Sequence, residues 1–251
     1  MLTVVAEICR VTARQLLGRR RTVLLVLLAA VPLLLGLLFR ASGFHGASVR
    51  ADRDFIASVF DALLITLLVP LIALLFGTAA FGAEIEDGTV VYLLAKPVPR
   101  AAVVAAKFAV ACAAALILSA GSTLLTGLIA LSDVNGAPGV IVGYAVGAAA
   151  GAVVYGAVFV ALSLLTSRAL VGGLIYMLLW EGVLANFLSG IRFLSVRQYA
   201  LGIADAAGVN GQITPETLNG TTAVALAVAV TLVAAIVAVR RLQAFEIPQS
   251  D

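Results

Sequence analysis

Six apolar runs of the sequence are each long enough to cross a lipid bilayer as a helix, and they constrain the fold more than any other feature. A helix that rises about 1.5 Å per residue needs roughly 20 apolar residues to span a hydrocarbon core of about 30 Å. A helix also satisfies its own backbone hydrogen bonds in that core. The runs predict an all-α membrane protein with six transmembrane helices: Thr22–Phe39, Val59–Phe81, Ala101–Leu131, Pro138–Leu165, Ala169–Leu188 and Thr221–Val239.

The composition agrees with the bilayer as solvent. Hydrophobic residues make up 63% of the 251 residues and charged residues only 12%, against about 25% charged in soluble domains. The chain is therefore not a cytosolic enzyme, a disulfide-stapled secreted domain or a nucleic-acid binder, and we expect a single membrane domain over residues 1–251. The two cysteines are far apart and the single histidine, His45, cannot build a metal cluster, so we expect no catalytic or metal site.

The basic residues orient the expected spans. Six spans return the chain to the side on which it starts, so both termini share one side of the membrane. Eleven of the 16 Lys and Arg residues fall on that side and five on the other. The positive-inside rule therefore predicts cytoplasmic termini.

The leader, residues 1–21, has the pattern of an amphipathic helix. Glu7, Arg10 and Arg14 recur at spacings of three and four and line one side. Such a helix would lie in the cytoplasmic interface, with its arginines near anionic headgroups. The leader can equally be the basic anchor of the first span, and the two interpretations are compatible. The opposite side of the helix carries Val4, Val5, Ile8, Val11 and Thr12.

The connection over residues 82–100, expected on the cytoplasmic side, carries the clearest functional signal. Three acids are followed by a Gly88-Thr89 step, by an apolar patch and by two prolines. Asp87 or Thr89 can cap a short helix, which the prolines then end. The exposed apolar patch on such a helix requires a partner surface that covers it.

The order of residues in this connection is specific: acids, a Gly-Thr step, a Leu-Leu pair, a Lys-Pro-Val step, an arginine and, seven residues later, a lysine. This order resembles the first cytoplasmic loop of type-2 ATP-binding-cassette (ABC) permeases. It departs at Pro99, where the family usually has a small polar residue, and at Ala106, where glycine is common. In the family this loop is a coupling helix that fits a cleft in an ATPase. The resemblance assigns that role to Glu84, Glu86, Asp87, Gly88, Thr89, Tyr92, Leu93, Leu94, Lys96, Arg100 and Lys107.

The resemblance also implies a function for the whole chain. It implies the membrane-spanning permease subunit of an exporter in a bacterial or archaeal plasma membrane, which moves an amphipathic or hydrophobic substrate by alternating access at a dimer interface. The sequence has no Gly-x-x-x-x-Gly-Lys-Ser/Thr loop, so no cofactor is expected on this chain. ATP and Mg would bind to two partner ATPase subunits. The other expected partners are lipid and a second permease, either a copy or a homologue.

Other functions stay open at this point. Some compact permeases of the same type serve the maturation of copper-containing metalloenzymes. An intramembrane enzyme is disfavoured, because the only histidine lies in an expected outer loop, away from any nucleophile such as Ser122. A passive channel is disfavoured, because the expected spans carry few charges and the cytoplasmic loop would have no purpose. The sequence does not identify the substrate-binding residues.

Glu181 is the carboxylate expected deepest in the membrane, inside the fifth span. There it must face a polar cavity, pair with a cation or be protonated. The nearest cations in sequence are Arg192 and Arg197, in an outer loop over residues 189–220 whose composition suits a re-entrant helix. Glu181 therefore either contacts substrate or ties down that turn, whereas Asp61 is expected simply at the outer interface.

A glycine stripe marks the fourth expected span. Gly143, Gly147 and Gly151 repeat every four residues and share one helical face. Small residues at this spacing let helix backbones approach closely in lipid. The stripe predicts a packing surface, either within one subunit or at a dimer seam.

Overall fold

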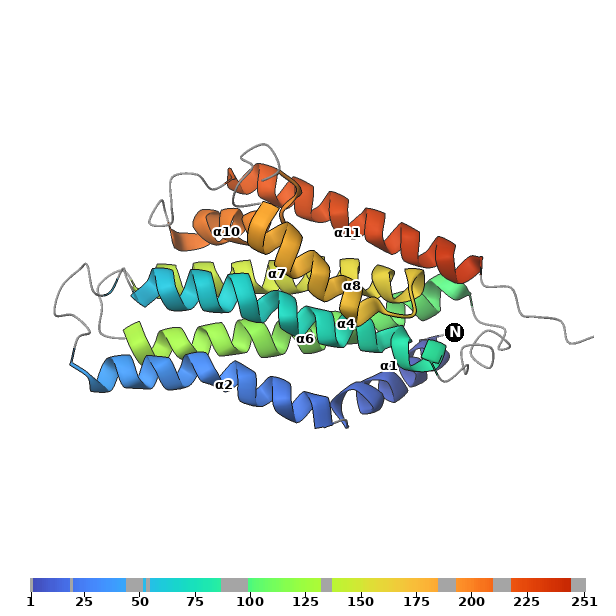
Figure 1. Ribbon diagram of the computed structural model, residues 1–251, viewed down its shortest axis with the longest axis horizontal. Helices are drawn as coiled ribbons and strands as arrows, with labels where there is room; N and C mark the ends of the chain where they lie inside the picture. The colour runs from blue at the N-terminus through green and yellow to red at the C-terminus, as the bar shows by residue number, and fades with distance from the viewer. Residues whose placement is uncertain are drawn as a thin grey trace, which may run out of the picture.

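The computed structural model describes residues 2–18, 20–43, 52, 55–86, 99–131, 137–184, 193–209 and 218–244. All regular structure within these ranges is helical, and Figure 1 shows the helices as an elongated bundle. In chain order the elements, of which η1, η2 and η4 are π-helical, are α1 (Leu2–Leu17), α2 (Arg20–Ala41), η1 (Ile56–Leu68), α4 (Val69–Glu86), α6 (Arg100–Leu131), α7 (Ala137–Leu165), α8 (Ala169–Ile175), η2 (Tyr176–Leu184), α10 (Val196–Ala204), η4 (Asp205–Val209) and α11 (Gly220–Gln243).

Five of the described helices are long and apolar enough to cross a membrane, which confirms the predicted all-α membrane class. The fifth expected span, Ala169–Leu188, corresponds to α8 and η2, which form a shorter apolar helix, and its last residues lie outside the described ranges. The count of six spans therefore stays a prediction. The five long helices correspond to the other five expected spans: Thr22–Ala41, Ser58–Gly82, Arg100–Leu131, Ala137–Leu165 and Gly220–Gln243.

The bundle has two ends, and successive long helices run between them in alternating directions (Figure 1). At one end, which we call the terminal end, lie α1, the end of α4, the start of α6 and the end of α11. At the other, the α10 end, lie α10, η4 and the start of η1. Since α1 and the last turn of α11 share an end, the arrangement agrees with an even number of crossings. That the terminal end faces the cytoplasm stays a prediction.

Helix α7 lies at the centre and packs against α4, α6, α10 and α11. Glycines bring these helices close together. A Cβ atom added at Gly77 of α4 would lie 2.8 Å from the Phe159 Cβ, and one at Gly127 of α6 would lie 2.7 Å from the Ile141 Cγ1. Close packing of this kind holds helices together in lipid, where the hydrophobic effect between them is absent.

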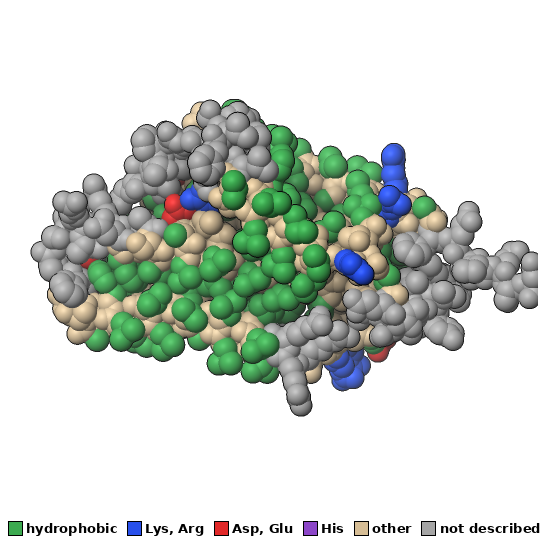
Figure 2. Space-filling view, viewed as in Figure 1, with side chains coloured by type: hydrophobic (Ala, Val, Ile, Leu, Met, Phe, Trp, Pro, Cys, Tyr) green, Lys and Arg blue, Asp and Glu red, His purple; other side chains and the backbone are tan. Residues whose placement is uncertain are grey.

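The outward faces of the bundle are apolar. Exposed leucine, isoleucine and valine side chains line α2, α6, η2 and α11. Figure 2 shows apolar side chains over the middle of one face, with most of the Lys and Arg side chains in view toward the terminal end. A surface of this kind suits hydrocarbon bounded by charged interfaces.

Helix α1 packs against α6 and α4 instead of standing apart from the bundle. Thr12 and Leu16 are buried and Ile8 is half-buried, whereas the charged side chains of the helix are exposed, as expected for an amphipathic leader. The i, i+4 row from Ile8 to Leu16 faces the bundle, and Val11, which lies beside that row, is exposed.

Candidate functional site

The expected coupling loop is described only at its two roots, the end of α4 and the start of α6. Its middle lies outside the described residues: Asp87, Gly88, Thr89, Tyr92, Leu93, Leu94 and Lys96. Glu84 and Glu86 lie in the last turn of α4, and Arg100 is the first residue of α6. The structure thus places four of the eleven expected coupling residues, including Lys107, around the base of the loop.

Lys107 joins the two roots from inside the protein. Its Nζ donates hydrogen bonds to the Ala80 carbonyl oxygen at 2.6 Å and to the Glu84 Oε1 at 2.7 Å, and it lies 4.9 Å from the centre of the Phe81 ring. The residue is only 1% exposed. A buried ammonium group needs such partners, because an unpaired charge there is costly. Lys107 therefore fixes α6 to the last turns of α4 and presents no surface to a partner protein.

Arg100 links the same root to the last helix. Its Nη1 donates hydrogen bonds to the Leu242 carbonyl oxygen at 3.1 Å and to that of Gln243. The last carbonyl groups of a helix have no partner within the helix, and the negative end of the helix dipole favours a cation there. Arg100 therefore ties the start of α6 to the end of α11.

Helix α1 completes the base of the loop. The Cys9 thiol lies 3.8 Å from the Ala106 carbonyl oxygen, and the Thr22 hydroxyl donates a hydrogen bond to the Leu16 carbonyl oxygen between α1 and α2. The elements α1, α4, α6 and α11 thus meet where the loop leaves the bundle. Among the described residues, this base therefore consists of packing and hydrogen-bond contacts that connect the two roots of the loop with α1 and α11.

Glu181 lies at the α10 end, where its carboxylate accepts hydrogen bonds from the first turn of α10. The side chain is 3% exposed. Its Oε1 accepts hydrogen bonds from the Val196 backbone N–H at 2.8 Å and the Tyr176 hydroxyl at 3.3 Å, and its Oε2 accepts one from the Ser195 hydroxyl. Ser195 is the N-cap of α10, and its hydroxyl oxygen also accepts from the Gln198 N–H. A carboxylate is stabilised at this position by the free N–H groups and the helix dipole.

The cations that the sequence offered to Glu181 are not its partners among the described residues. Arg192 lies outside them, and Arg197 pairs with Asp61, which the sequence had placed simply at the interface. The Arg197 Nη2 lies 2.9 and 3.2 Å from the two carboxylate oxygens of Asp61, and its Nε donates to the Thr66 hydroxyl at 2.7 Å. Both charged side chains are 18% exposed. Asp61 and Arg197 are 136 positions apart and meet only in the fold, so the sequence did not predict that they pair.

The π-helical winding of η1 and η2 explains how each segment directs two polar side chains toward the start of α10. In an α-helix, residues five apart point about 140° away from each other, whereas π-helical hydrogen bonds place them nearly one above the other. Thr66 lies five residues after Asp61, and Glu181 five residues after Tyr176, and each pair is joined by a hydrogen bond. Each segment therefore presents two polar groups toward the start of α10.

Helix α10 also packs against the glycine stripe of α7. A Cβ atom at Gly143 would lie 2.6 Å from the Ala204 carbonyl oxygen, and one at Gly147 would lie 2.5 Å from that of Ala200. At Gly151 the nearest atoms are the Val69 Cγ1 at 3.2 Å and the Ala200 Cβ at 3.3 Å. The stripe serves packing within the chain, which was one of its two expected uses.

Comparison with known proteins gives one family. The model of a family described as "ABC-2 family transporter protein" matches residues 17–245. No curated protein matches the chain. The matched range begins at the last residue of α1 and includes every later helix together with the connection over residues 82–100.

Proposed function

This chain belongs to the ABC-2 family of transporter proteins, and we propose that it is the permease subunit of an exporter that moves an amphipathic or hydrophobic substrate out of the cytoplasm. Membership makes it a membrane-spanning subunit of an ABC transporter that is not itself catalytic. The direction of transport, the substrate and the number of partners belong to the proposal.

The observation that carries the proposal is the construction at the base of the connection over residues 82–100. Lys107 joins that base to α4 and Arg100 joins it to the end of α11, so the loop is fastened to two membrane helices. Such fastening suits a loop that receives force from a partner, because slack at its roots would absorb the movement.

The partners that fit are two ABC ATPase subunits, with which the family generally works. They would bind ATP and Mg and hold the short helix of the loop. Its acids, Glu86 and Asp87 among them, suit basic groups on the ATPase, and Leu93 and Leu94 suit an apolar cleft. A second permease, identical or homologous, would complete the transport path.

The α10 end supports alternating access. There Glu181 and Asp61 hold a short helix against the centre of the bundle. In an exporter this helix would close the outer end of the path while the terminal end is open. No observation favours a role in metalloenzyme maturation, so it is not part of the proposal.

The experiment starts with affinity purification of this chain from native membranes together with its ATPase. The complex is placed in lipid nanodiscs, and its ATPase activity is compared with that of the isolated ATPase. We expect the double variant Leu93→Ala/Leu94→Ala to lose most ATPase binding or stimulation, because these side chains are the expected apolar anchor, worth about 2 kcal/mol or more.

The matched control is Leu24→Ala/Leu27→Ala, which removes two exposed leucines from the lipid-facing side of α2. This control should leave ATPase stimulation at the wild-type level. Full stimulation in the Leu93/Leu94 variant, with the same amount of ATPase bound, would contradict the coupling role.

A further inference from the structure

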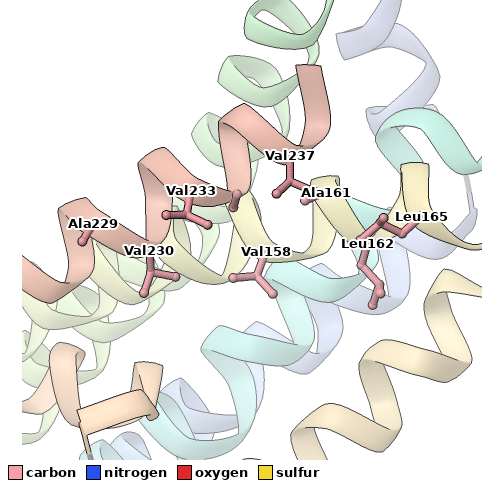
Figure 3. Close-up of a pocket in the computed structure, with 9 residues that line it drawn as sticks. Val158, Ala161, Leu162, Leu165, Ala229, Val230, Val233 and Val237 are labelled. Atoms are coloured by element: carbon pink, nitrogen blue, oxygen red, sulfur yellow. The ribbon is translucent and has the colours of Figure 1, made fainter. Parts of the chain in front are cut away.

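An apolar groove of about 380 Å³ runs between α7 and α11, in the half of the bundle nearer the terminal end. Four side chains of α7, from Val158 to Leu165, and five of α11, from Ala229 to Val237, line it. Figure 3 shows the two sets facing each other across the groove. All of them are alanine, valine or leucine, so the groove offers an occupant no hydrogen bond from a side chain.

The dimensions of the groove suit a single acyl chain. The lining residues span seven steps on α7 and eight on α11, or roughly 10 to 12 Å at about 1.5 Å per residue. This length is close to half of a hydrocarbon core of about 30 Å, so the groove runs through most of one leaflet. An α-helix with its side chains is about 10 Å wide. A groove of this length with a volume of about 380 Å³ is too small to hold such a helix.

The groove ends in positive charge. Arg240 and Arg241 follow Val237 by three and four residues, so they extend the same face of α11 by one turn. On the other wall, Leu165 is followed by Arg168 in the turn before α8. Helices α7, α8 and α11 contain no aspartate or glutamate. Three arginines therefore follow the lining residues at this end of the groove, and the two helices that line it carry no acidic side chain.

From this charge complementarity we propose that the groove binds an anionic phospholipid of the leaflet at the terminal end. One acyl chain fills the groove, and the headgroup phosphate pairs with Arg168, Arg240 and Arg241. Guanidinium groups match phosphate oxygens with two parallel hydrogen bonds, and long arginine side chains reach the headgroup level from the end of a membrane helix. The proposal goes beyond the function proposed above, because neither ATPase coupling nor the direction of transport enters it.

The test uses the full chain in nanodiscs of phosphatidylcholine. One sample contains a trace of phosphatidylglycerol with a photoactivatable acyl chain, and the other contains phosphatidylcholine with the same acyl chain at the same mole fraction. After illumination, mass spectrometry measures labelling of residues 158–165 and 229–237. We expect phosphatidylglycerol to label these residues at least about fivefold more, which is the factor that even a single arginine provides at roughly 1 kcal/mol near an anionic lipid.

Two pairs of variants separate the charge from the groove. Arg168→Gln/Arg240→Gln/Arg241→Gln should bring the labelling ratio of the two lipids close to one, whereas Arg168→Lys/Arg240→Lys/Arg241→Lys should keep a preference for phosphatidylglycerol. The control Arg10→Gln/Arg14→Gln removes two exposed arginines from α1 at the same end. It should leave the ratio unchanged, because α1 does not line the groove and its arginines take no part in the proposed phosphate site.

Val233→Trp should fill the groove and remove labelling by both lipids, since Val233 lines it and is 60% exposed. Leu232→Trp, at a neighbouring residue that is 58% exposed but does not line the groove, should not. Equal labelling by the two lipids in the wild type would overturn the proposal in favour of bulk lipid. Cross-linking of the groove to a second copy of the chain would overturn it in favour of a subunit contact. Loss of ATPase coupling would affect none of these readouts.

Discussion

The two ends of the bundle are fastened by different kinds of polar contact. At the terminal end, the ion pair of Lys107 and Glu84 joins the two helices that lead into the loop; the Lys107 side chain is almost fully enclosed by protein, at 2% exposure, whereas the Glu84 side chain is 16% exposed. At the α10 end, Glu181 is as deeply buried but binds neutral donors, and the ion pair between Asp61 and Arg197 is partly exposed. The terminal end is thus built to keep its helices together, and the α10 end has one firm and one weaker attachment.

This difference suits the two tasks in the proposed export cycle. A loop that receives force from an ATPase needs roots that do not separate. A short helix at the outer end has to be held in place, yet its attachments have to allow movement. Removing one partner of a buried ion pair lowers the stability of a protein by several kcal/mol, whereas an exposed pair contributes about 1 kcal/mol or less to stability.

The largest expected effect is that of Lys107→Met. It removes the cation beside Glu84 from a buried site and should lower the stability of the bundle by about 3 kcal/mol. Thermal unfolding of the purified chain in detergent measures the loss. The double variant Lys107→Met/Glu84→Gln should recover part of it, because no carboxylate is then left facing the lost cation. A single variant as stable as the wild type would show that the terminal end is not held by this pair.

Glu181→Ala should have the next largest effect. It leaves the Ser195 hydroxyl, the Val196 N–H and the Tyr176 hydroxyl without their acceptor, at a cost of about 2 kcal/mol. Glu181→Gln keeps an acceptor oxygen at the start of α10 and should lose about half as much. The same thermal unfolding measurement compares the two. Equal losses would mean that the negative charge matters at this position, and not only the acceptor.

The smallest effect is expected for the pair of Asp61 and Arg197. In a double-mutant cycle with Asp61→Asn and Arg197→Gln, we expect a coupling free energy of at most about 1 kcal/mol, because both groups reach solvent. Raising the salt concentration should reduce the coupling further. A coupling of 3 kcal/mol that salt does not change would place this pair in the same class as Lys107 and Glu84 and would remove the contrast between the two ends.

Much of the fold could be predicted from the sequence. Long apolar runs predict membrane helices by length alone, and five of them are present as such. The order of residues from Glu84 to Lys107 indicated the family, because it combines turn, charge and apolar features at fixed spacing. The stripe from Gly143 to Gly151 predicted close packing, since glycine leaves room for another backbone.

The contacts of the α10 end could not be predicted in the same way. Asp61 was expected at the interface because it lies near the outer end of the second expected span, and Arg197 was a possible partner for Glu181 because it is close in sequence. The signal that was available is the occurrence of Asp61 and Thr66 in an otherwise apolar run. Their spacing of five is uninformative for an α-helix, and nothing in an evenly apolar run distinguishes π-helical from α-helical winding.

The sequence by itself determined that this chain lies in a membrane, where its long helices run and which family it resembles, because hydrophobic length and local residue order are properties of the chain alone. Only the tertiary structure decided which polar groups meet. In a bilayer a buried charge or hydroxyl must find a partner wherever the packing of helices brings one. The packing of α10 against α7 therefore brings the Ser195 hydroxyl within hydrogen-bond distance of Glu181, and Arg197 beside Asp61.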